Sequence, residues 1–197
     1  MRCLAFGLIL AFSATFLGGC FFEPRSAESP GGVSITYLPQ SEPKNVLANI
    51  ETALAYQDAA GYERQIAEVF TYEPDSDTQA SYPGVDWASW DRERELAFMS
   101  DFLGTVDGMF VDMSAEEHVT DWSGSEAFLE YTYSVEVNEG GGTVPYRAKV
   151  SLDFRLDGTY WVLTRWFDQQ GETDPDSGSP LPSLGQRRGA FAAAGGG

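Results

Sequence analysis

Two neighbouring stretches decide the fold: LEYTYSVEV at residues 129–137 and VPYRAKVSLDFRL at residues 144–156. In both, apolar and polar residues alternate, which predicts strands with one buried and one solvated face. The sequence NEGGG at 138–142 forms the turn between them. Asp157-Gly158 is typical of a hairpin, so residues 159–168 are predicted to form a third strand. We expect three antiparallel neighbours in one sheet.

Upstream of these strands the apolar period changes to that of helices. Helices are predicted at residues 43–58, at about 62–70 and at 91–103, where Asp91, Glu93 and Glu95 suit the positive end of the helix dipole. Residues 110–113 are expected to form an early strand, and the following segment is ambiguous between helix and strand. Helices first and antiparallel strands last predict an α+β domain.

The middle of the chain resembles the nuclear transport factor 2-like superfamily, the cone-shaped, cystatin-like fold shared by ketosteroid isomerases and polyketide cyclases. The resemblance implies three N-terminal helices packed on a strongly curved antiparallel sheet, within a domain at residues 41–170. It rests on Ala55-Tyr56 before Asp58, on Tyr62 and Ile66, on Phe70-x-Tyr72-x-Pro74, and on Trp161-x-Leu163-x-x-Trp166-x-Asp168.

The N-terminus is predicted to be a lipoprotein signal peptide, residues 1–19. The uncharged run at residues 4–17 is shorter than the roughly 20 residues that cross a bilayer. Leu17-Gly18-Gly19-Cys20 resembles the bacterial lipobox, which implies lipid on Cys20 and a membrane as partner. An ordinary signal peptide is the alternative. Because Phe21 rather than Asp follows Cys20, the resemblance implies the outer membrane if the host has two membranes.

Segments rich in Pro, Gly and Ser flank the domain. Residues 20–40 are predicted to be a flexible tether, and residues 171–197 a disordered C-terminal tail.

Composition excludes several classes of function. The chain carries 30 acidic and 12 basic residues, a formal charge of −18, which argues against nucleic acid as a partner. Its two cysteines, Cys3 and Cys20, precede the domain, and His118 is the single histidine. Disulfides, cysteine- or histidine-based metal sites and a Cys/His nucleophile pair are therefore not expected in the domain, and no cofactor is expected.

Three residues are candidates for acid–base catalysis, because isomerases with this fold move a proton with a carboxylate near a tyrosine. Tyr56 lies on the first helix and Asp112 on an early strand. Alternation favours a solvent-facing Asp112, since Val111 and Met113 flank it. His118 follows Glu116 and Glu117, which favours a surface ion pair over a catalytic base.

Aromatic residues are candidates for a ligand pocket inside the cone. Tyr56, Trp90, Tyr133 and Trp166 could line a site for a small, flat, apolar ligand. Large aromatics also fill cores, which is the interpretation we favour for the tryptophans. The sequence therefore favours a non-catalytic binding or interaction module. The alternatives are a small-molecule enzyme of the isomerase, dehydratase or cyclase type, and a scaffold that forms homodimers through the sheet.

Overall fold

The computed structural model describes residues 34–196. The signal peptide, Cys20 and the tether up to residue 33 lie outside the described residues. The elements in chain order are α1 (Pro43–Ala55), α2 (Ala59–Glu63), β1 (Ile66–Glu73), α3 (Ser76–Ser81), a 3-10 turn (Trp87–Ser89), α4 (Arg92–Thr105), β2 (Gly108–Ser123), β3 (Glu126–Glu139), β4 (Gly142–Asp157), β5 (Tyr160–Gly171) and α5 (Gly185–Ala193). The predicted α+β class is confirmed.

The five strands form one sheet in the order β1-β5-β4-β3-β2. The three strands predicted from alternation are neighbours, with Tyr131 opposite Val150 and Leu152 opposite Trp166. The ambiguous segment around His118 belongs to β2, which pairs antiparallel with β3. The sheet is antiparallel except at one edge, where β1 runs parallel to β5.

The β1 strand corrects the prediction of a second helix at 62–70. Only α2 is helical there, and the Asp58 side chain caps it by accepting a hydrogen bond from the Gly61 amide at 2.9 Å. From Ile66 the chain is extended, with Phe70 and Tyr72 buried and Val69 and Thr71 exposed. A short apolar run fits both periods, and pairing beside β5 decides for the strand.

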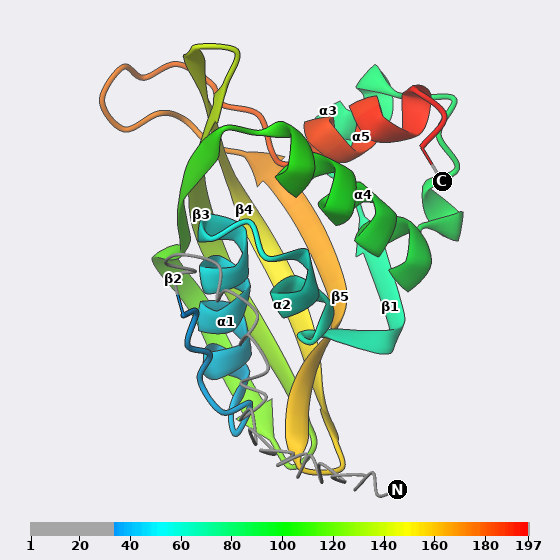
Figure 1. Ribbon diagram of the computed structural model, residues 1–197, viewed down its shortest axis with the longest axis vertical. Coiled ribbons are helices and arrows are strands. Elements are labelled where there is room, and N and C mark those ends of the chain that lie inside the picture. Colours follow the sequence, from blue (N-terminus) through cyan, green and yellow to red (C-terminus); the bar gives the residue numbers. More distant parts are fainter. Residues whose placement is uncertain (1–33, 197) are drawn as a thin grey trace, which may run out of the picture. The chain divides into compact units, whose positions relative to one another are not determined.

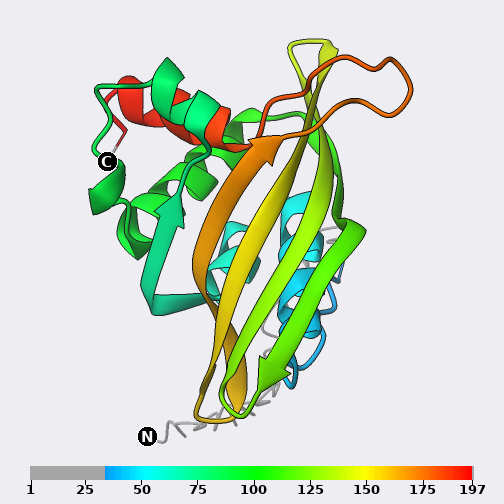
Figure 2. The same cartoon turned by 180° about the vertical axis from the view of Figure 1, so that it is seen from behind.

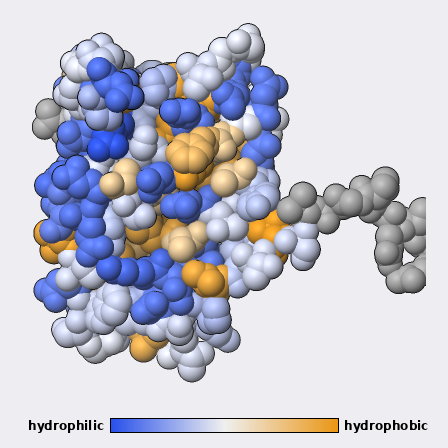
Figure 3. All heavy atoms as spheres, turned by 90° about the vertical axis from the view of Figure 1, so that its left-hand side faces the viewer, coloured by the Kyte–Doolittle hydropathy of each residue, from blue (hydrophilic) through white to orange (hydrophobic). Residues whose placement is uncertain are grey.

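The helices cover one face of the sheet, which we call the inner face. The α1 helix packs on β2 and β5, α4 packs on β1, and α5 contacts α3 and α4 (Figure 1). From behind, none of the helices formed by residues 34–196 lies in front of β2 to β5, so they leave the outer face of the sheet uncovered (Figure 2). The side that carries α1 and β2 shows small apolar patches between hydrophilic residues (Figure 3). No helix within residues 34–196 is long and apolar enough to span a bilayer.

The domain begins before residue 41, because the end of the predicted tether packs onto it. The Tyr37 hydroxyl donates to Asp58 Oδ2 at 2.7 Å. The Leu38 amide donates to Asn49 Oδ1 at 2.7 Å, and the Trp161 amide donates to the Gln40 carbonyl at 2.8 Å. These contacts hold residues 37–40 against α1, α2 and β5.

The prediction of a disordered C-terminal tail is wrong for residues 171–196. The segment after β5 stays bonded to β4, since the Arg147 amide donates to the Pro182 carbonyl at 3.0 Å. It then forms α5, whose Arg188 is fully buried. A Cβ on Gly189 would lie 2.2 Å from the Tyr82 ring, so α5 packs too closely there for a larger residue. The Pro, Gly and Ser content of the segment concealed these anchoring residues.

Candidate functional site

A buried ion pair joins α4 to α5. Arg188 Nε donates to Glu95 Oε2 at 2.9 Å and Nη2 donates to Oε1 at 2.7 Å, although the residues are 93 positions apart. Both side chains are 0% exposed. The Glu95 carboxylate also accepts from the Tyr62 hydroxyl and from Trp90 Nε1, each at 2.8 Å. Four donors therefore hold this carboxylate, which offsets part of the cost of removing it from water.

A second buried carboxylate, Asp168 on β5, lies beside the same guanidinium. It accepts from the Tyr72 hydroxyl at 2.8 Å, from the Tyr133 hydroxyl at 3.2 Å and from Trp166 Nε1 at 2.9 Å. Arg188 Nη1 is 3.9 Å from Asp168 Oδ2, close enough to attract it but too far to donate a hydrogen bond. Burial raises the pKa of Asp168 above its ordinary value, and the charge of Arg188 opposes that rise.

Aromatic rings surround the guanidinium. Arg188 Cζ lies 4.3 Å from the centre of the Tyr72 ring, 5.0 Å from Phe98 and 4.9 Å from Trp166. A desolvated cation is attracted to such ring faces. Burial by itself would lower the pKa of Arg188, but the charge and hydrogen bonds of Glu95 outweigh it, so the pKa is raised well above its ordinary value. Arg188 is therefore a cation inside the cone.

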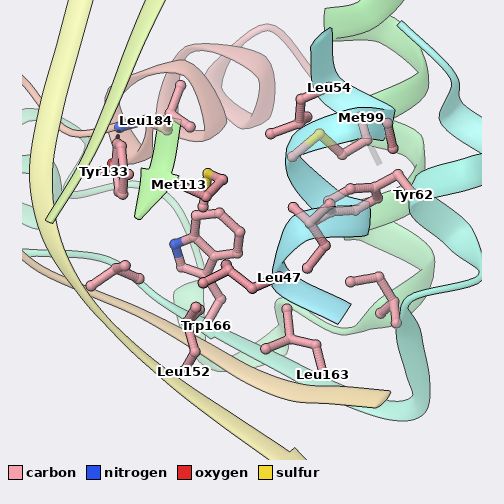
Figure 4. Close-up of a cluster of buried hydrophobic side chains, with 14 of the residues drawn as sticks. Leu47, Leu54, Tyr62, Met99, Met113, Tyr133, Leu152, Leu163, Trp166 and Leu184 are labelled. Atoms are coloured by element: carbon pink, nitrogen blue, oxygen red, sulfur yellow. Dashed lines mark hydrogen bonds between the residues drawn. The ribbon is translucent and has the colours of Figure 1, made fainter. Parts of the chain in front are cut away.

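We call Glu95, Asp168 and Arg188 the acid–arginine cluster. The segment before α5 closes over it. The Tyr133 hydroxyl accepts from the Leu184 amide at 2.7 Å (Figure 4). The neighbouring Ser183 hydroxyl donates to the buried carboxylate of Asp75, which caps α3 through the Thr78 amide at 2.8 Å. The segment that leads into α5 is thus fixed to β3 through Tyr133 and to α3 through Asp75.

Three of the four predicted pocket residues lie at this cluster. Trp90, Tyr133 and Trp166 are at most 1% exposed and donate to its carboxylates. Trp166 lies among Leu47, Met113 and Leu152 (Figure 4). Trp90, Trp161 and Trp166 belong to the hydrophobic core, and the partly buried Trp87 packs against it. Tyr56 differs, because it is 54% exposed just after α1 and lies outside the cone.

The structure does not bring the three predicted catalytic residues together. Asp112 is half-buried opposite Ser134, and its Oδ1 accepts from the Ser114 amide at 3.0 Å. His118 is exposed on β2, and its Nε2 lies 2.8 Å from Thr132 Oγ1. Both belong to the outer face, as the alternation of Asp112 with Val111 and Met113 suggested. Tyr56 is at the end of α1. Within residues 34–196 no group of three or more His, Cys, Asp and Glu side chains is arranged to hold a metal ion.

Sequence reasoning missed Glu95, Asp168 and Arg188 as site residues. Glu95 was assigned to the helix dipole, yet it continues the buried stripe of α4 formed by Phe98, Met99, Phe102 and Leu103. That register was a usable signal. Asp168 extends the inward alternation of Trp166 on β5. For Arg188, the local sequence carries no comparable signal.

The comparisons with known proteins show the fold. No protein-family model matches the chain, and no curated protein matches it. A solved structure from Novosphingobium aromaticivorans, provisionally described as an aromatic ring hydroxylase, matches with a TM-score of 0.56 and 12% identity over 73% of this chain and 92% of that chain. A conserved protein from Planctomyces limnophilus matches with a TM-score of 0.53 and 16% identity over 64% and 91%. A protein of unknown function from Mycobacterium tuberculosis matches with a TM-score of 0.51 and 11% identity over 76% and 82%.

The domain has a cone-shaped, cystatin-like fold. Structures described as NTF2-like or cystatin-like also match, but only at TM-scores below 0.5. At such low identities a likeness shows the fold alone, and the function has to be argued from the site.

Proposed function

We propose that this protein is a lipid-anchored protein of the cell envelope whose cone-shaped domain is a binding module. Its binding site is the cone interior at the acid–arginine cluster, and α5 closes that site. The observation that carries the proposal is that Arg188 comes from α5, outside the elements that supply its acidic partners. A site built by α4 and β5 is filled by a side chain from the last helix of the chain.

The hydrogen bonding of the cluster favours binding over catalysis. Four donors of the protein hold Glu95 and three hold Asp168, so the hydrogen-bonding capacity of both carboxylates is largely engaged, which disfavours a role in moving protons. The single histidine, His118, lies at the surface. Buried polar groups with fixed partners give a site orientation and specificity.

The position of α5 suits a movable cover. The helix contacts α3 and α4 and belongs to no strand pair, so it can leave without breaking the sheet. Its release would break the buried pair of Arg188 with Glu95, so this pair holds the cover in place.

Undocking α5 tests the proposal. Gly189→Val should displace α5, because a Cβ there meets the Tyr82 ring, whereas Gly104→Ala adds a Cβ with open space around it. Native mass spectrometry of the mature proteins, extracted from membranes, should find a small molecule retained by the Gly189→Val protein and absent from the other two. Faster amide exchange at residues 185–193 would verify the undocking. If the Gly189→Val protein has the mass of its own mature chain and nothing more after verified undocking, the proposal is contradicted.

The lipid anchor is proposed from the lipobox resemblance at Cys20. Two or more acyl chains give stable membrane attachment, since each buried methylene adds about 0.8 kcal/mol. In a host with two membranes the protein would lie in the outer membrane. Cys20→Ser should abolish acyl labelling and move the protein to the soluble fraction or leave it uncleaved. Unchanged labelling and membrane association would refute the anchor.

A second candidate is an enzyme of the isomerase, dehydratase or cyclase type. It is supported by Asp168, a buried carboxyl of raised pKa between the hydroxyls of Tyr72 and Tyr133. Such an enzyme should exchange a carbon-bound proton of its ligand with D₂O, and Asp168→Asn should stop the exchange. A retained molecule that takes up no deuterium would favour the binding module.

The third candidate, a homodimer through the sheet, is supported by apolar side chains on the outer face. Val69 is 69% exposed and Phe110 is 64% exposed, and a hollow of about 660 Å³ crosses this face from Thr71 on β1 to Asp121 on β2. Sedimentation should give a dimer that Phe110→Asp dissociates. A monomer at all concentrations would exclude this scaffold.

A further inference from the structure

We infer that the cone interior is a recognition site for a small alkylguanidinium cation, and that Arg188 occupies this site as an internal substitute for that ligand. The inference rests on the proposed function, because it names the ligand class of the same site. It draws on three features of the cluster: its fork of acceptors, its surplus of carboxylates and its aromatic walls.

The acceptors fit the planar fork of a guanidinium. The two oxygens of Glu95 receive Nε and Nη2 of Arg188 at 2.9 and 2.7 Å. Parallel hydrogen bonds of this kind are specific for guanidinium, since an ammonium cannot present two donors in one plane at that spacing. The Tyr62 hydroxyl and Trp90 Nε1 hold the Glu95 carboxylate in place for the pairing.

The site offers more carboxylate oxygens than Arg188 uses as hydrogen-bond acceptors. Glu95 and Asp168 are two buried carboxylates facing one guanidinium. Arg188 Nη1 is buried without a hydrogen-bond partner and lies 3.9 Å from Asp168 Oδ2. The helix that carries Arg188 fixes where the guanidinium can reach. A free cation lacks this restraint and can bridge both carboxylates with hydrogen bonds of normal length.

The aromatic walls favour a flat, weakly hydrated cation. The rings of Tyr72, Phe98 and Trp166 lie within 5.0 Å of Arg188 Cζ, and the site is fully buried. Guanidinium is less strongly hydrated than ammonium and packs its faces on rings, so it loses less on entering such a site. We therefore expect alkylguanidinium to bind more tightly than alkylammonium of similar length.

Arg188 competes with such a ligand within the same chain. A tethered group acts at an effective concentration in the millimolar range or above. The wild-type protein should therefore bind a free alkylguanidinium weakly, and removal of the Arg188 side chain should expose the full affinity.

The experiment uses the mature full chain with Arg188→Ala. This change removes the atoms that ethylguanidinium would replace. Titration calorimetry and thermal unfolding should show binding of ethylguanidinium, weaker binding of propylammonium, and no binding of the neutral ethylurea. A second change, Glu95→Gln, should weaken ethylguanidinium binding by about tenfold or more, as expected when a charged hydrogen-bond partner is lost. If Arg188→Ala does not fold unaided, it should fold on addition of millimolar ethylguanidinium and not of ethylurea.

The matched control is Arg187→Ala. Arg187 is the adjacent arginine, half-buried and paired with Glu139 outside the cluster, and its removal should create no guanidinium site. Equal binding of ethylguanidinium and ethylurea by Arg188→Ala would overturn the inferred ligand class while leaving a binding site in the cone. No effect of ethylguanidinium would overturn the inference outright, and the mass measurement on Gly189→Val would then judge the proposed function separately.

Discussion

The two halves of the cone interior are equally buried but chemically opposite. Under α1 the interior is apolar: Leu47 and Ile50 belong to the same core cluster as Met113 and Leu163. Between α4, α5 and β5 it holds the acid–arginine cluster, whose three side chains are 0% exposed. In the apolar half each side chain contributes by its own burial. In the polar half each charge is stable only while its partners are present. In the apolar half the loss of folding free energy should scale with the volume removed. In the polar half any substitution that breaks the ion pair should cost nearly the full amount.

The largest effect is expected from Arg188→Ala, which leaves Glu95 and Asp168 without their cation. The free energy of unfolding should fall by about 3–5 kcal/mol, the usual cost of breaking a buried ion pair. Urea denaturation followed by tryptophan fluorescence measures it. Arg188→Lys should lose nearly as much, because an ammonium cannot reproduce the paired hydrogen bonds to Glu95. If Arg188→Ala lowers the free energy of unfolding by less than Arg187→Ala does, the proposed contrast between the two halves of the interior is wrong.

In the apolar half, Ile50→Ala should cost about 3 kcal/mol and Ile50→Val about 1 kcal/mol, since the loss follows the volume removed. The same denaturation series measures both. At Ile50 the loss should therefore depend on the size of the replacement, whereas at Arg188 alanine and lysine should cost nearly the same. Equal losses for the two Ile50 variants would show that the apolar half is also all-or-none.

A smaller, pH-dependent effect on the free energy of unfolding is expected at the start of α2, where the Tyr37 hydroxyl and the Gly61 amide donate hydrogen bonds to Asp58. The Tyr37 hydroxyl is the main cause of the lowered pKa of Asp58. A carboxyl whose pKa is lowered on folding stabilises the folded state above its unfolded pKa, and this contribution is lost as the pH falls through the folded pKa. Asp58→Asn should therefore cost about 1 kcal/mol at neutral pH and nothing in strong acid.

Denaturation of Asp58→Asn and the wild type across acidic and neutral pH checks this. In a Tyr37→Phe background the same replacement should have a reduced pH dependence, because the donor is gone. If the difference in free energy of unfolding between Asp58→Asn and the wild type is the same in strong acid as at neutral pH, the charge of Asp58 is not its cause.

The smallest effect is expected on the outer face. Phe110→Ser should change the free energy of unfolding of the monomer by no more than about 0.5 kcal/mol, because Phe110 is 64% exposed. Thermal unfolding at low protein concentration measures it. A cost comparable to that of Ile50→Ala would mean that this face is covered in solution.

The sequence predicted the apolar half of the interior far better than the polar half. β3 and β4 each have one buried face, so alternation located them, and the Asp157-Gly158 turn located β5. β1 was misjudged because a short apolar run fits helix and strand, and its pairing with β5 is set by distant residues.

The polar half depends on contacts that local sequence does not encode. Arg187 and Arg188 are adjacent and chemically identical, yet one pairs with Glu139 at half-burial and the other enters the cone. The docking of α5 on α3 and α4, with Gly189 against Tyr82, decides between them. Glu95 was predictable from its register in the buried stripe of α4, and Asp168 from the inward alternation of β5.

The most direct test of the account is a double-mutant cycle between Glu95 and Arg188, with Glu95→Gln, Arg188→Ala and the double variant measured by urea denaturation. If the Arg188–Glu95 ion pair holds α5 in place, the free energy of unfolding lost through Arg188→Ala should be smaller by about 2 kcal/mol or more when residue 95 is already glutamine. Additive losses would contradict the account, because α5 would then be held by packing alone and the guanidinium would not be what the site recognises.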